Sequence, residues 1–414
     1  MRTTVDYDTL WSLEGKALLP PSLASFVQQF AGKEDLIRMH VGLPASETFP
    51  FLGFSANARR CDELVAISEP GSVSAAQQYS FGPGYPELLK WASNLVMRCH
   101  APSVPYEIVM TAGAVHAISN IVSVLADRGD TIVIDEYAYV HVTECVLLPK
   151  GINLLPICMD SHGMLPNHLD QQLSKARLEA SAAGRKPPKL LYTVPSGHNP
   201  TGLIMTVERK HKLYEVCQKH DVLIIEDDAY YWLQFYQQQK QQYVTATGAH
   251  VEDESRREQD HNEGRSSPSV QSHMVVESDR FTTATTSCSS LPGPSERPAL
   301  DMTSDTPGLS QLPSSFLSMD TDSRVIRVDT LSKLMGPGYR LGWVTCAPKL
   351  ASKLAMSVQG NCVGPSSLSM VLLESLVRTW GETTFEDFVR DTQRLYQRRG
   401  EVAFKAATQQ SLRV

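Results

Sequence analysis

Residues 222–231 read Val222-Leu223-Ile224-Ile225-Glu226-Asp227-Asp228-Ala229-Tyr230-Tyr231. Four apolar and mostly β-branched residues are followed at once by three acidic residues, an alanine and two tyrosines. A continuous apolar run of this length is typical of a strand that is covered on both faces, as in parallel sheets. The acidic residues and tyrosines then lie at the carboxyl end of the strand, which is where open α/β sheets bind ligands.

The same pattern recurs on both sides of this stretch. Five further apolar runs predict strands, at Ile108–Met110, Thr131–Ile134, Leu190–Val194, Val325–Val328 and Leu341–Val344. Amphipathic stretches predict helices at Ala114–Leu125, Leu165–Ala180, Val207–His220, Lys349–Val358, Ser367–Trp380 and Thr384–Thr408. Strands that alternate with helices are typical of a parallel α/β sheet, so we predict an α/β fold.

Composition excludes several functional classes. The 414 residues are 42% hydrophobic and 20% charged, and 38 basic against 45 acidic residues give a net charge of −7. This balance disfavours a nucleic-acid binder with a basic surface. No apolar run approaches the roughly 20 residues that span a bilayer, and the first 20 residues lack the apolar core of a secretion signal. The eight cysteines form no C-x-x-C pair, so we expect reduced thiols, no metal site and a cytoplasmic location.

One segment differs in composition from the rest of the chain. Residues 237–315 are first rich in Gln and then rich in Ser, Thr and Pro, with few aliphatic side chains. Such a segment cannot bury enough apolar surface to offset the entropy lost on ordering. We predict a low-complexity, disordered surface insertion that loops out of the sheet, with a phosphorylated or partner-binding loop as the alternative.

Four polar groups follow predicted strands and should meet at one edge of the sheet. They are Asp135–Tyr139, Pro195–Gly202, Glu226–Tyr231 and Asp329–Lys333. Together they supply carboxylates, an amide, phenols, hydroxyls and a lysine. The chain has no metal-ligand spacing, no phosphate-binding Walker loop and no Gly-x-Ser-x-Gly turn, which argues against a zinc enzyme, an NTPase and a serine hydrolase.

In their order along the chain, these motifs resemble a known enzyme family. Asn199-Pro200-Thr201-Gly202, Asp227-x-x-Tyr230, Ser332-Lys333 and Arg340 are similar to the signature of fold-type I pyridoxal 5'-phosphate (PLP) enzymes. Within these, the chain most resembles class I/II aminotransferases of the kynurenine/2-aminoadipate and fungal aromatic branch. The resemblance implies a mostly parallel sheet in a large domain, a smaller second domain and transamination of an aromatic or 2-aminoadipate-like amino acid with a 2-oxo acid, such as 2-oxoglutarate.

The resemblance also implies a division of the chain into five parts. We expect an N-terminal arm with a small-domain segment in residues 1–70. The large PLP-binding domain takes residues 71–236 and 316–350, on either side of the insertion at 237–315. Residues 351–414 would hold interdomain helices and the start of a C-terminal domain.

The catalytic role falls on Lys333, whose amine would form a Schiff base with the cofactor aldehyde and move the α-proton of the substrate. By the same resemblance, Asp227 would pair with the protonated pyridine nitrogen and keep the ring electron-poor. Tyr230 and Asn199 would donate hydrogen bonds to the ring oxygen, and Asn199 would also contact substrate. The histidines nearest to these motifs, His116 and His198, match no family role.

Other residues would hold the phosphate and the ring face. Arg340, Ser332 and Thr330 match the phosphate-binding residues, completed by the helix-terminal amides of Ala114 and Val115. Relatives often carry hydroxyl or amide side chains at these last two positions, whereas this chain offers only backbone N–H groups.

Aromatic and loop residues complete the implied site. Tyr139 matches the aromatic ring that stacks on the pyridine. Tyr79 resembles a tyrosine that reaches the neighbouring subunit's site, which implies a homodimer. Gly42, in Gly42-Leu43-Pro44, matches a loop over the substrate.

The end of the chain leaves alternatives open. Relatives bind the substrate carboxylate with an arginine of the small C-terminal domain, and Arg398, Arg399 and Arg413 do not match its place. We therefore expect a chain truncated within the helix that precedes that domain. A fold-type I lyase and a non-catalytic PLP-binding protein remain alternatives to an aminotransferase.

Overall fold

The computed structural model describes residues 4–20, 43–80, 82–235 and 308–411, with side chains up to residue 408. All of these residues belong to one of two units, formed by residues 1–235 and 306–414. The other unit, residues 236–305, lies outside the described residues. The insertion predicted at 237–315 therefore lies outside them as well, except for its last eight residues.

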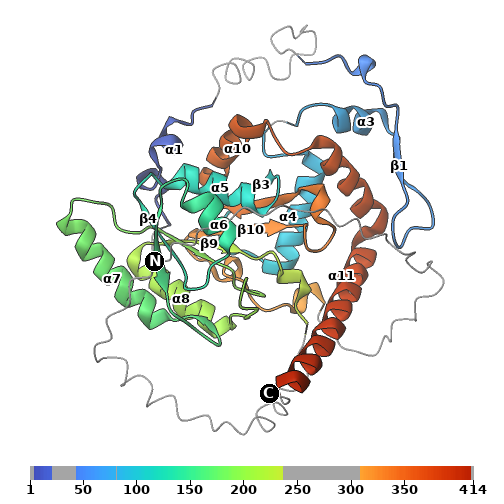
Figure 1. Ribbon diagram of the computed structural model, residues 1–414. Helices are drawn as coiled ribbons and strands as arrows, with labels where there is room; N and C mark the ends of the chain where they lie inside the picture. The colour runs from blue at the N-terminus through green and yellow to red at the C-terminus, as the bar shows by residue number, and fades with distance from the viewer. Residues whose placement is uncertain (1–3, 21–42, 81, 236–307, 412–414) are drawn as a thin grey trace, which may run out of the picture. The chain divides into compact units, whose positions relative to one another are not determined.

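A seven-stranded sheet forms the centre of the described unit (Figure 1). Its strand order is β3-β11-β10-β9-β8-β4-β5. The strands are β3 (Glu107–Thr111), β4 (Thr131–Asp135), β5 (Asn153–Ile157), β8 (Leu190–Thr193), β9 (Leu223–Asp227), β10 (Val325–Thr330) and β11 (Gly342–Cys346). Neighbouring strands from β10 to β5 run parallel, and β11 is antiparallel to both of its neighbours.

The six predicted strands are all present, and the mostly parallel α/β sheet is confirmed. Two features differ from the expectation. β11 is antiparallel, because only 11 residues separate its start from the end of β10, which is too few for a helical crossover. β5 was not predicted, because this edge strand carries an exposed Asn153 and a proline among partly buried residues and so lacks a continuous apolar run.

Helices cover both faces of the sheet. The longer ones are α3 (Pro70–Gln77), α4 (Pro86–His100), α5 (Ala114–Leu125), α7 (Pro166–Ala182), α8 (Val207–His220), α10 (Pro348–Cys362) and α11 (Ser367–Ser411). One hydrophobic cluster joins one sheet face to α4, α7, α8 and α11, and another joins the opposite face to α5 and α10. Because both faces are covered, β8, β9 and β10 are buried along their whole length.

Shorter elements complete the described residues. Two small antiparallel pairs are β1 (Phe54–Ala56) with β2 (Val65–Ile67) and β6 (Met159–Asp160) with β7 (Gly163–Met164). The short helices are α1 (Leu13–Ala17) and α6 (Val140–Val142), a π-helical turn at Thr143–Leu147, and 3-10 turns at Tyr7–Thr9, Ser46–Thr48, Tyr231–Leu233, Leu309–Gln311, Leu317–Met319 and Pro337–Tyr339.

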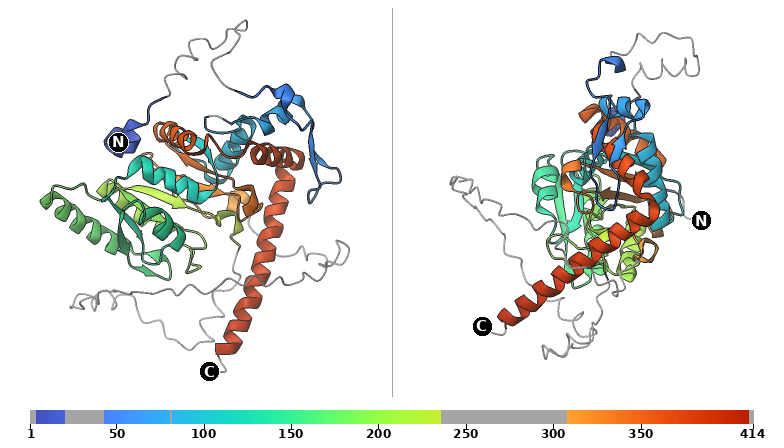
Figure 2. Two further views of the ribbon diagram at one scale, coloured as in Figure 1. Left: turned by 45° about the horizontal axis from the view of Figure 1, so that its top comes forward. Right: turned by 90° about the vertical axis from the view of Figure 1, so that its right-hand side faces the viewer.

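Several helix ends follow directly from the sequence. Four of the longer helices begin with proline, whose fixed φ and missing N–H suit the first helical position. The Thr206 hydroxyl accepts from the Arg209 N–H and so caps α8. α11 changes direction at Gly381, whose φ of 67° is non-helical, so the predicted break between Trp380 and Thr384 is confirmed (Figure 2).

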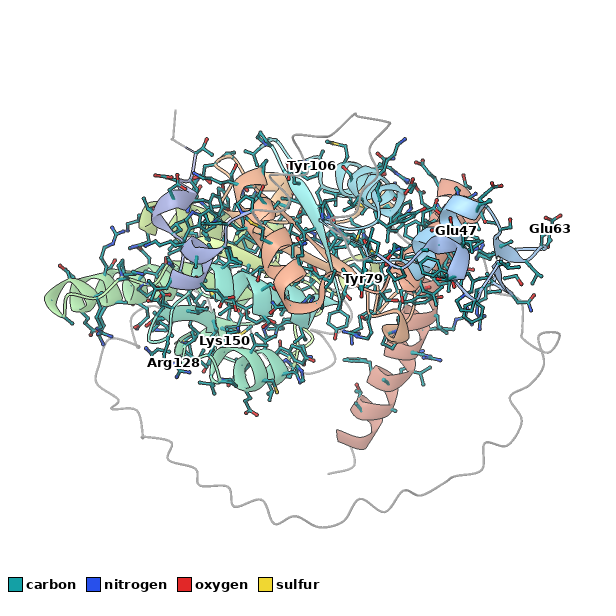
Figure 3. All side chains as sticks on the ribbon, turned by 90° about the horizontal axis from the view of Figure 1, so that it is seen from above. Glu47, Glu63, Tyr79, Tyr106, Arg128 and Lys150 are labelled. Carbon is teal, nitrogen blue, oxygen red and sulfur yellow. The ribbon has the colours of Figure 1, made fainter. Side chains whose placement is uncertain are left out.

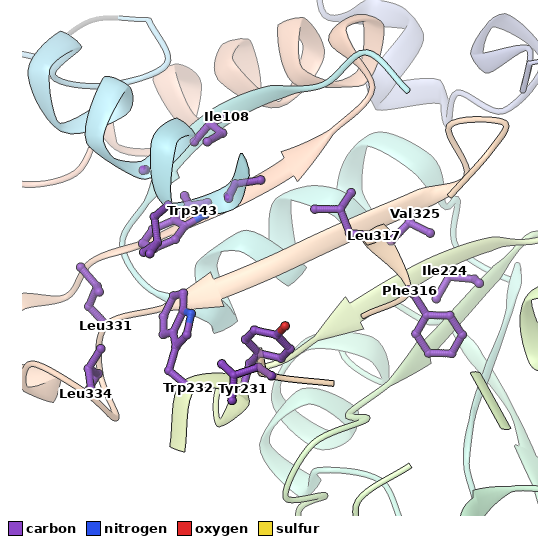
Figure 4. Packing of buried hydrophobic residues seen from close by; sticks show 14 of the residues in the cluster. Ile108, Ile224, Tyr231, Trp232, Phe316, Leu317, Val325, Leu331, Leu334 and Trp343 are labelled. Atoms are coloured by element: carbon purple, nitrogen blue, oxygen red, sulfur yellow. The ribbon is translucent and has the colours of Figure 1, made fainter. Parts of the chain in front are cut away.

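Aromatic packing joins the sheet to the segment after β9. The ring centroids of Trp343 on β11 and Trp232 lie 5.7 Å apart (Figure 4). The Trp91 ring meets Trp343 edge-on, with a centroid distance of 6.2 Å. Among the described residues, no helix is both long and apolar enough to cross a membrane.

The C-terminal boundary of the predicted insertion needs a correction. Leu309 and Leu312 are only 3% and 8% exposed and belong to the hydrophobic core, and Ser315 is fully buried. Residues 308–315 are therefore part of the folded unit. The composition of this stretch hides its role because its few apolar side chains are separated by polar residues.

Candidate active site

One cavity at the carboxyl edge of the parallel strands collects the predicted cofactor-binding residues. It has a volume of about 180 Å³. All ten line it: Ala114, Val115, Tyr139, Asn199, Asp227, Tyr230, Thr330, Ser332, Lys333 and Arg340. They follow β4, β8, β9 and β10 or begin α5, so the parallel topology is what brings them together. Val194, Ala229 and Pro337 also line the cavity and were not predicted.

Asp227 places a carboxylate with a free oxygen against the cavity. Its Oδ2 accepts a hydrogen bond of 2.9 Å from the Tyr192 hydroxyl. Its Oδ1 is buried and accepts no hydrogen bond from the described residues. Burial raises the pKa of Asp227 to about 7, which the Tyr192 hydrogen bond opposes and the Asp228 and Asp329 carboxylates increase. A buried acid of this kind is completed by a ligand that brings a donor, such as a protonated ring nitrogen.

The sequence analysis missed Tyr192. It lies within the predicted strand Leu190–Val194 and is only 1% exposed. The signal that could have revealed it is a hydroxyl in an apolar run, since a buried phenol needs a hydrogen-bond partner.

The opposite part of the cavity is built for an anion. α5 begins at Ala114, and its N-terminal N–H groups lack a side-chain cap. Arg340 donates from Nη2 to the Ala112 carbonyl at 3.1 Å and from Nη1 to the Pro337 carbonyl at 3.0 Å. Among the described residues it forms no ion pair with a carboxylate. Helix amides and a guanidinium without a carboxylate partner form a site for a phosphate group.

Hydroxyl groups complete the anion site. The Thr330 hydroxyl donates to Ser332 Oγ at 3.0 Å, and Arg340 Nη1 approaches the same oxygen at 3.4 Å. Gly113 is required beside them, because its φ is +92° and an added Cβ would lie 2.5 Å from Arg340 Nη2. The chain therefore keeps this position without a side chain to let the arginine approach the start of α5.

Lys333 and the aromatic residues lie around the remaining wall. Lys333 is exposed in the cavity, and its Nζ lies 5.6 Å from the ring centroid of Tyr230. Tyr139, at the start of α6, is partly buried and stacks on His141 with a centroid distance of 6.0 Å. The amine, the phenol and the ring are thus all available to one ligand.

The Asn199 turn is fixed by main-chain hydrogen bonds on both sides. His198 N donates to the Leu203 carbonyl at 2.8 Å, and Gly202 N donates to the His198 carbonyl at 2.5 Å. Gly197 has a φ of +60°, and a Cβ there would lie 3.3 Å from Tyr230. The turn therefore packs against Tyr230, and the two predicted donors to the ring oxygen are neighbours.

Of the three predicted substrate-binding residues, one lies outside the described residues and one lines a different pocket. Gly42 lies outside the described residues. Tyr79 is 56% exposed and lines a second pocket together with residues that include Gln78, Cys362 and Pro365 (Figure 3). The third predicted substrate contact, Asn199, lines the cavity as described above.

These residues fit PLP. The free Asp227 oxygen suits a ring nitrogen that carries a proton, and the start of α5 with Arg340 suits the phosphate. Lys333 supplies the amine that an aldehyde requires. Fold and site together thus have the features of a PLP-binding site of fold type I.

Comparison with known proteins agrees with the predicted resemblance to aminotransferases. Residues 55–255 match the family model described as aminotransferase class I and II. An aromatic amino acid aminotransferase of Dictyostelium discoideum is 30% identical over 375 residues, which are 89% of this chain and 63% of the relative. Over these residues the chain is similar to class I and II aminotransferases.

A second relative and a solved structure show the same similarity. A mitochondrial kynurenine/alpha-aminoadipate aminotransferase of Bos taurus is 28% identical over 383 residues, covering 90% of this chain and 72% of that protein. The crystal structure of the aminotransferase Aro8 from Candida albicans superimposes with a TM-score of 0.76 at 24% identity, covering 99% of this chain and 78% of that one. The chain thus spans about two thirds of the length of these curated relatives.

Proposed function

We propose that this chain transfers an amino group from an aromatic or 2-aminoadipate-like amino acid to a 2-oxo acid, with PLP as its cofactor. One observation carries the proposal. The Lys333 amine, the free oxygen of Asp227 and the anion site at Arg340 line a single cavity in an aminotransferase fold. Any two of the amine, the free carboxylate oxygen and the anion site could belong to other kinds of ligand, and only the three together point to PLP.

The chain's own residues divide the work. When bound, PLP supplies a ring that withdraws electrons from the substrate α-carbon. Asp227 would accept a hydrogen bond from the ring nitrogen and keep it protonated, while Tyr192 holds the carboxylate in place. Tyr230, Asn199 and Tyr139 line the cavity, where the first two would donate to the ring oxygen and the third would cover the ring face.

Lys333 performs the proton transfer. Its amine would hold the cofactor through the aldehyde group. Once free, the same amine would move the proton of the substrate α-carbon, as a general base followed by a general acid. Arg340, Ser332, Thr330 and the amides at the start of α5 anchor the phosphate, so the reacting carbon stays within reach of Nζ.

The substrate class is proposed from the relatives. Their names specify aromatic amino acids in one case and kynurenine or alpha-aminoadipate in the other. We propose the same donors here, with 2-oxoglutarate as acceptor. We also propose a cytoplasmic homodimer in which Tyr79 reaches the partner's cavity, because Tyr79 is exposed and lies away from the cavity of its own chain.

The test is covalent labelling of the purified protein with PLP. Absorbance spectra are recorded for the wild type, Lys333→Ala and the control Lys90→Ala, which replaces an exposed lysine that does not line the cavity. After borohydride reduction, mass spectrometry should find the cofactor on Lys333 in the wild type and in Lys90→Ala. The proposal is wrong if Lys333→Ala keeps the same absorbance band.

The substrate is tested with the PLP-bound enzyme to which no borohydride has been added. Tyrosine, phenylalanine, kynurenine and 2-aminoadipate should each change the absorbance and produce the matching 2-oxo acid, and 2-oxoglutarate should restore the spectrum. Alanine serves as the non-aromatic control. Ammonia release without an acceptor would instead show an elimination reaction, and no spectral change with any amino acid would show a non-catalytic protein.

A further inference from the structure

Asp135 is a buried carboxylate that the proposed reaction does not use. It ends β4, is 1% exposed, and neither of its oxygens accepts a hydrogen bond from the described residues. His198 Nε2 lies 3.4 Å from Asp135 Oδ2, which is within ion-pair distance although the two groups are not aligned as a hydrogen bond. Because an ionised carboxylate is costly to bury alone, the imidazole is the group that compensates it.

His198 is held from its other side as well. Its Nδ1 lies 2.8 Å from the Thr201 hydroxyl, and the side chain is 4% exposed. Nε2 is therefore the ring nitrogen that faces the Asp135 carboxylate, and Nδ1 is the one that faces the Thr201 hydroxyl. The ring is thus clamped between the end of β4 and the turn that follows β8.

This clamp determines where Asn199 points. Asn199 directly follows His198 and lines the cavity, whereas His198 itself does not. Main-chain hydrogen bonds from Gly202 and to Leu203 close the turn on His198, so Asn199 lies inside a loop whose anchor is the imidazole. We propose that His198, paired with Asp135 and Thr201, is a positioning residue that aims the Asn199 amide at the cofactor.

A second observation joins the same pair to the Asp227 side of the cavity. Burial first, and then the Asp227 and Asp135 carboxylates, raise the pKa of Tyr192 well above its usual value. The charge of Asp135 therefore acts at the phenol that holds Asp227.

Two substitutions separate the two contacts of the imidazole. His198→Asn keeps an amide near the position of Nδ1 and loses the contact to Asp135, whereas His198→Gln keeps an amide near Nε2 and loses Thr201. The control is His100→Gln, because His100 is also buried, at 3% exposure, and bonds a hydroxyl, Ser315 Oγ at 2.9 Å, without lining the cavity.

Two quantities are measured for each variant: the dissociation constant of PLP, from fluorescence quenching, and the pH midpoint of the absorbance change of the bound cofactor. We expect both His198 variants to bind PLP about three- to tenfold more weakly and to shift that midpoint, as for a weakened hydrogen bond. His100→Gln should lower thermal stability and leave both quantities unchanged. Equal behaviour of the His198 variants and the control would overturn the proposal.

The role of His198 rests on the proposed function, so a double-mutant cycle with Asn199→Ala separates the two. If His198 acts through Asn199, adding His198→Gln to Asn199→Ala should change PLP affinity by less than about twofold. An additive effect would show that His198 acts independently of Asn199, and the proposal would be wrong. If the wild type shows no absorbance band that depends on Lys333, the proposed function fails instead.

A third variant covers the case in which His198 variants do not fold. Thr201 is exposed, and Thr201→Val keeps the side-chain shape while removing the hydroxyl from Nδ1. With the melting temperature of the cofactor-free protein unchanged, this variant should still weaken PLP binding and shift the pH midpoint. An unchanged PLP affinity in a folded Thr201→Val protein would contradict the proposed clamp.

Discussion

Two carboxylate environments lie side by side at the end of β9 and differ in how completely they are satisfied. Glu226, Asp228 and Asp329 surround the fully buried guanidinium of Arg327, with nitrogen–oxygen distances of 3.2, 3.0 and 2.9 Å. Asp227 lies among them in the sequence but has one hydroxyl partner and one free oxygen. Each acid of the Arg327 cluster pairs with a cation of the protein, although Asp228 Oδ1 accepts no hydrogen bond from the described residues, whereas Asp227 forms no ion pair among them.

The difference follows from strand geometry. Successive side chains of a strand point to opposite faces, so Glu226 and Asp227 face different layers. Arg327 and Asp329 are two residues apart on β10 and so share one face of it, and Arg327 lies opposite Glu226 in the parallel register of β9 and β10. A single acidic stretch therefore supplies a folding element on one face and a ligand-binding group on the other.

The largest expected effect is the loss of Arg327. Arg327→Met leaves three carboxylates buried without their cation, so we expect a loss of about 3–5 kcal/mol of unfolding free energy. Chemical denaturation of the cofactor-free protein measures it. The double variant Arg327→Met/Asp329→Asn also removes one of the carboxylates that lost their cation, so part of the stability should return. An Arg327→Met protein as stable as the wild type would show that the cluster does not stabilise the fold.

Asp227→Asn tests the other environment. It removes a buried charge that has only one partner, so the stability of the cofactor-free protein should stay the same or rise. Amino-transfer activity should fall by about 100-fold or more, since the ring nitrogen loses the carboxylate that keeps it protonated. Denaturation and steady-state kinetics together decide the matter. If Asp227→Asn loses as much stability as Arg327→Met, the two carboxylate environments contribute to folding in the same way and the comparison is wrong.

The pH dependence of stability sharpens the comparison. The pKa of Asp227 is about 7 in the folded protein against 3.8 for an unperturbed carboxyl, so the folded state binds the proton more tightly. Its contribution is fully present below pH about 4 and is lost as the pH rises to about 7, by up to about 4 kcal/mol. Asp329, whose burial raises its pKa to about 6, acts in the same direction.

Cofactor-free wild type and Asp227→Asn should therefore be compared from pH 4 to pH 8. The Asp329 contribution is common to both proteins, so the difference between the curves reports Asp227. Stability of the wild type should fall more steeply with rising pH than that of the variant. Parallel curves would show that the carboxyl of Asp227 is not perturbed.

The sequence predicted the sheet because buried strands need continuous apolar runs, and these are visible one strand at a time. It predicted helices α5 and α8 with the bounds that the structure has, because both show an amphipathic period. It did not predict β5, whose exposed edge relaxes the pattern, or the antiparallel direction of β11, which follows from its short connection to β10.

The site divides in the same way. Residues at strand ends, such as Asn199 and Lys333, were predicted because they follow apolar runs and belong to motifs of a known family. Tyr192, Asp135 and Arg327 were not given roles, because each acts through a side-chain contact to another strand or turn. The spacing of residues in one segment carries no information about such contacts.

The smallest expected effect is that of removing the Tyr192 hydroxyl, which donates a hydrogen bond to Asp227. Tyr192→Phe keeps the ring in the core and removes the hydroxyl, which leaves both Asp227 oxygens without a donor. Since the Tyr192 hydrogen bond lowers the pKa of Asp227, the pH range in which stability falls should move upward. Stability should drop by about 1–2 kcal/mol, and PLP affinity by about tenfold, on the scale of one hydrogen bond to a charged group. The alternative outcome is that neither the pH range of the stability loss nor the PLP affinity changes. In that case the strand alone positions Asp227, and Asp227 differs from the Arg327 cluster in burial and not in hydrogen bonding.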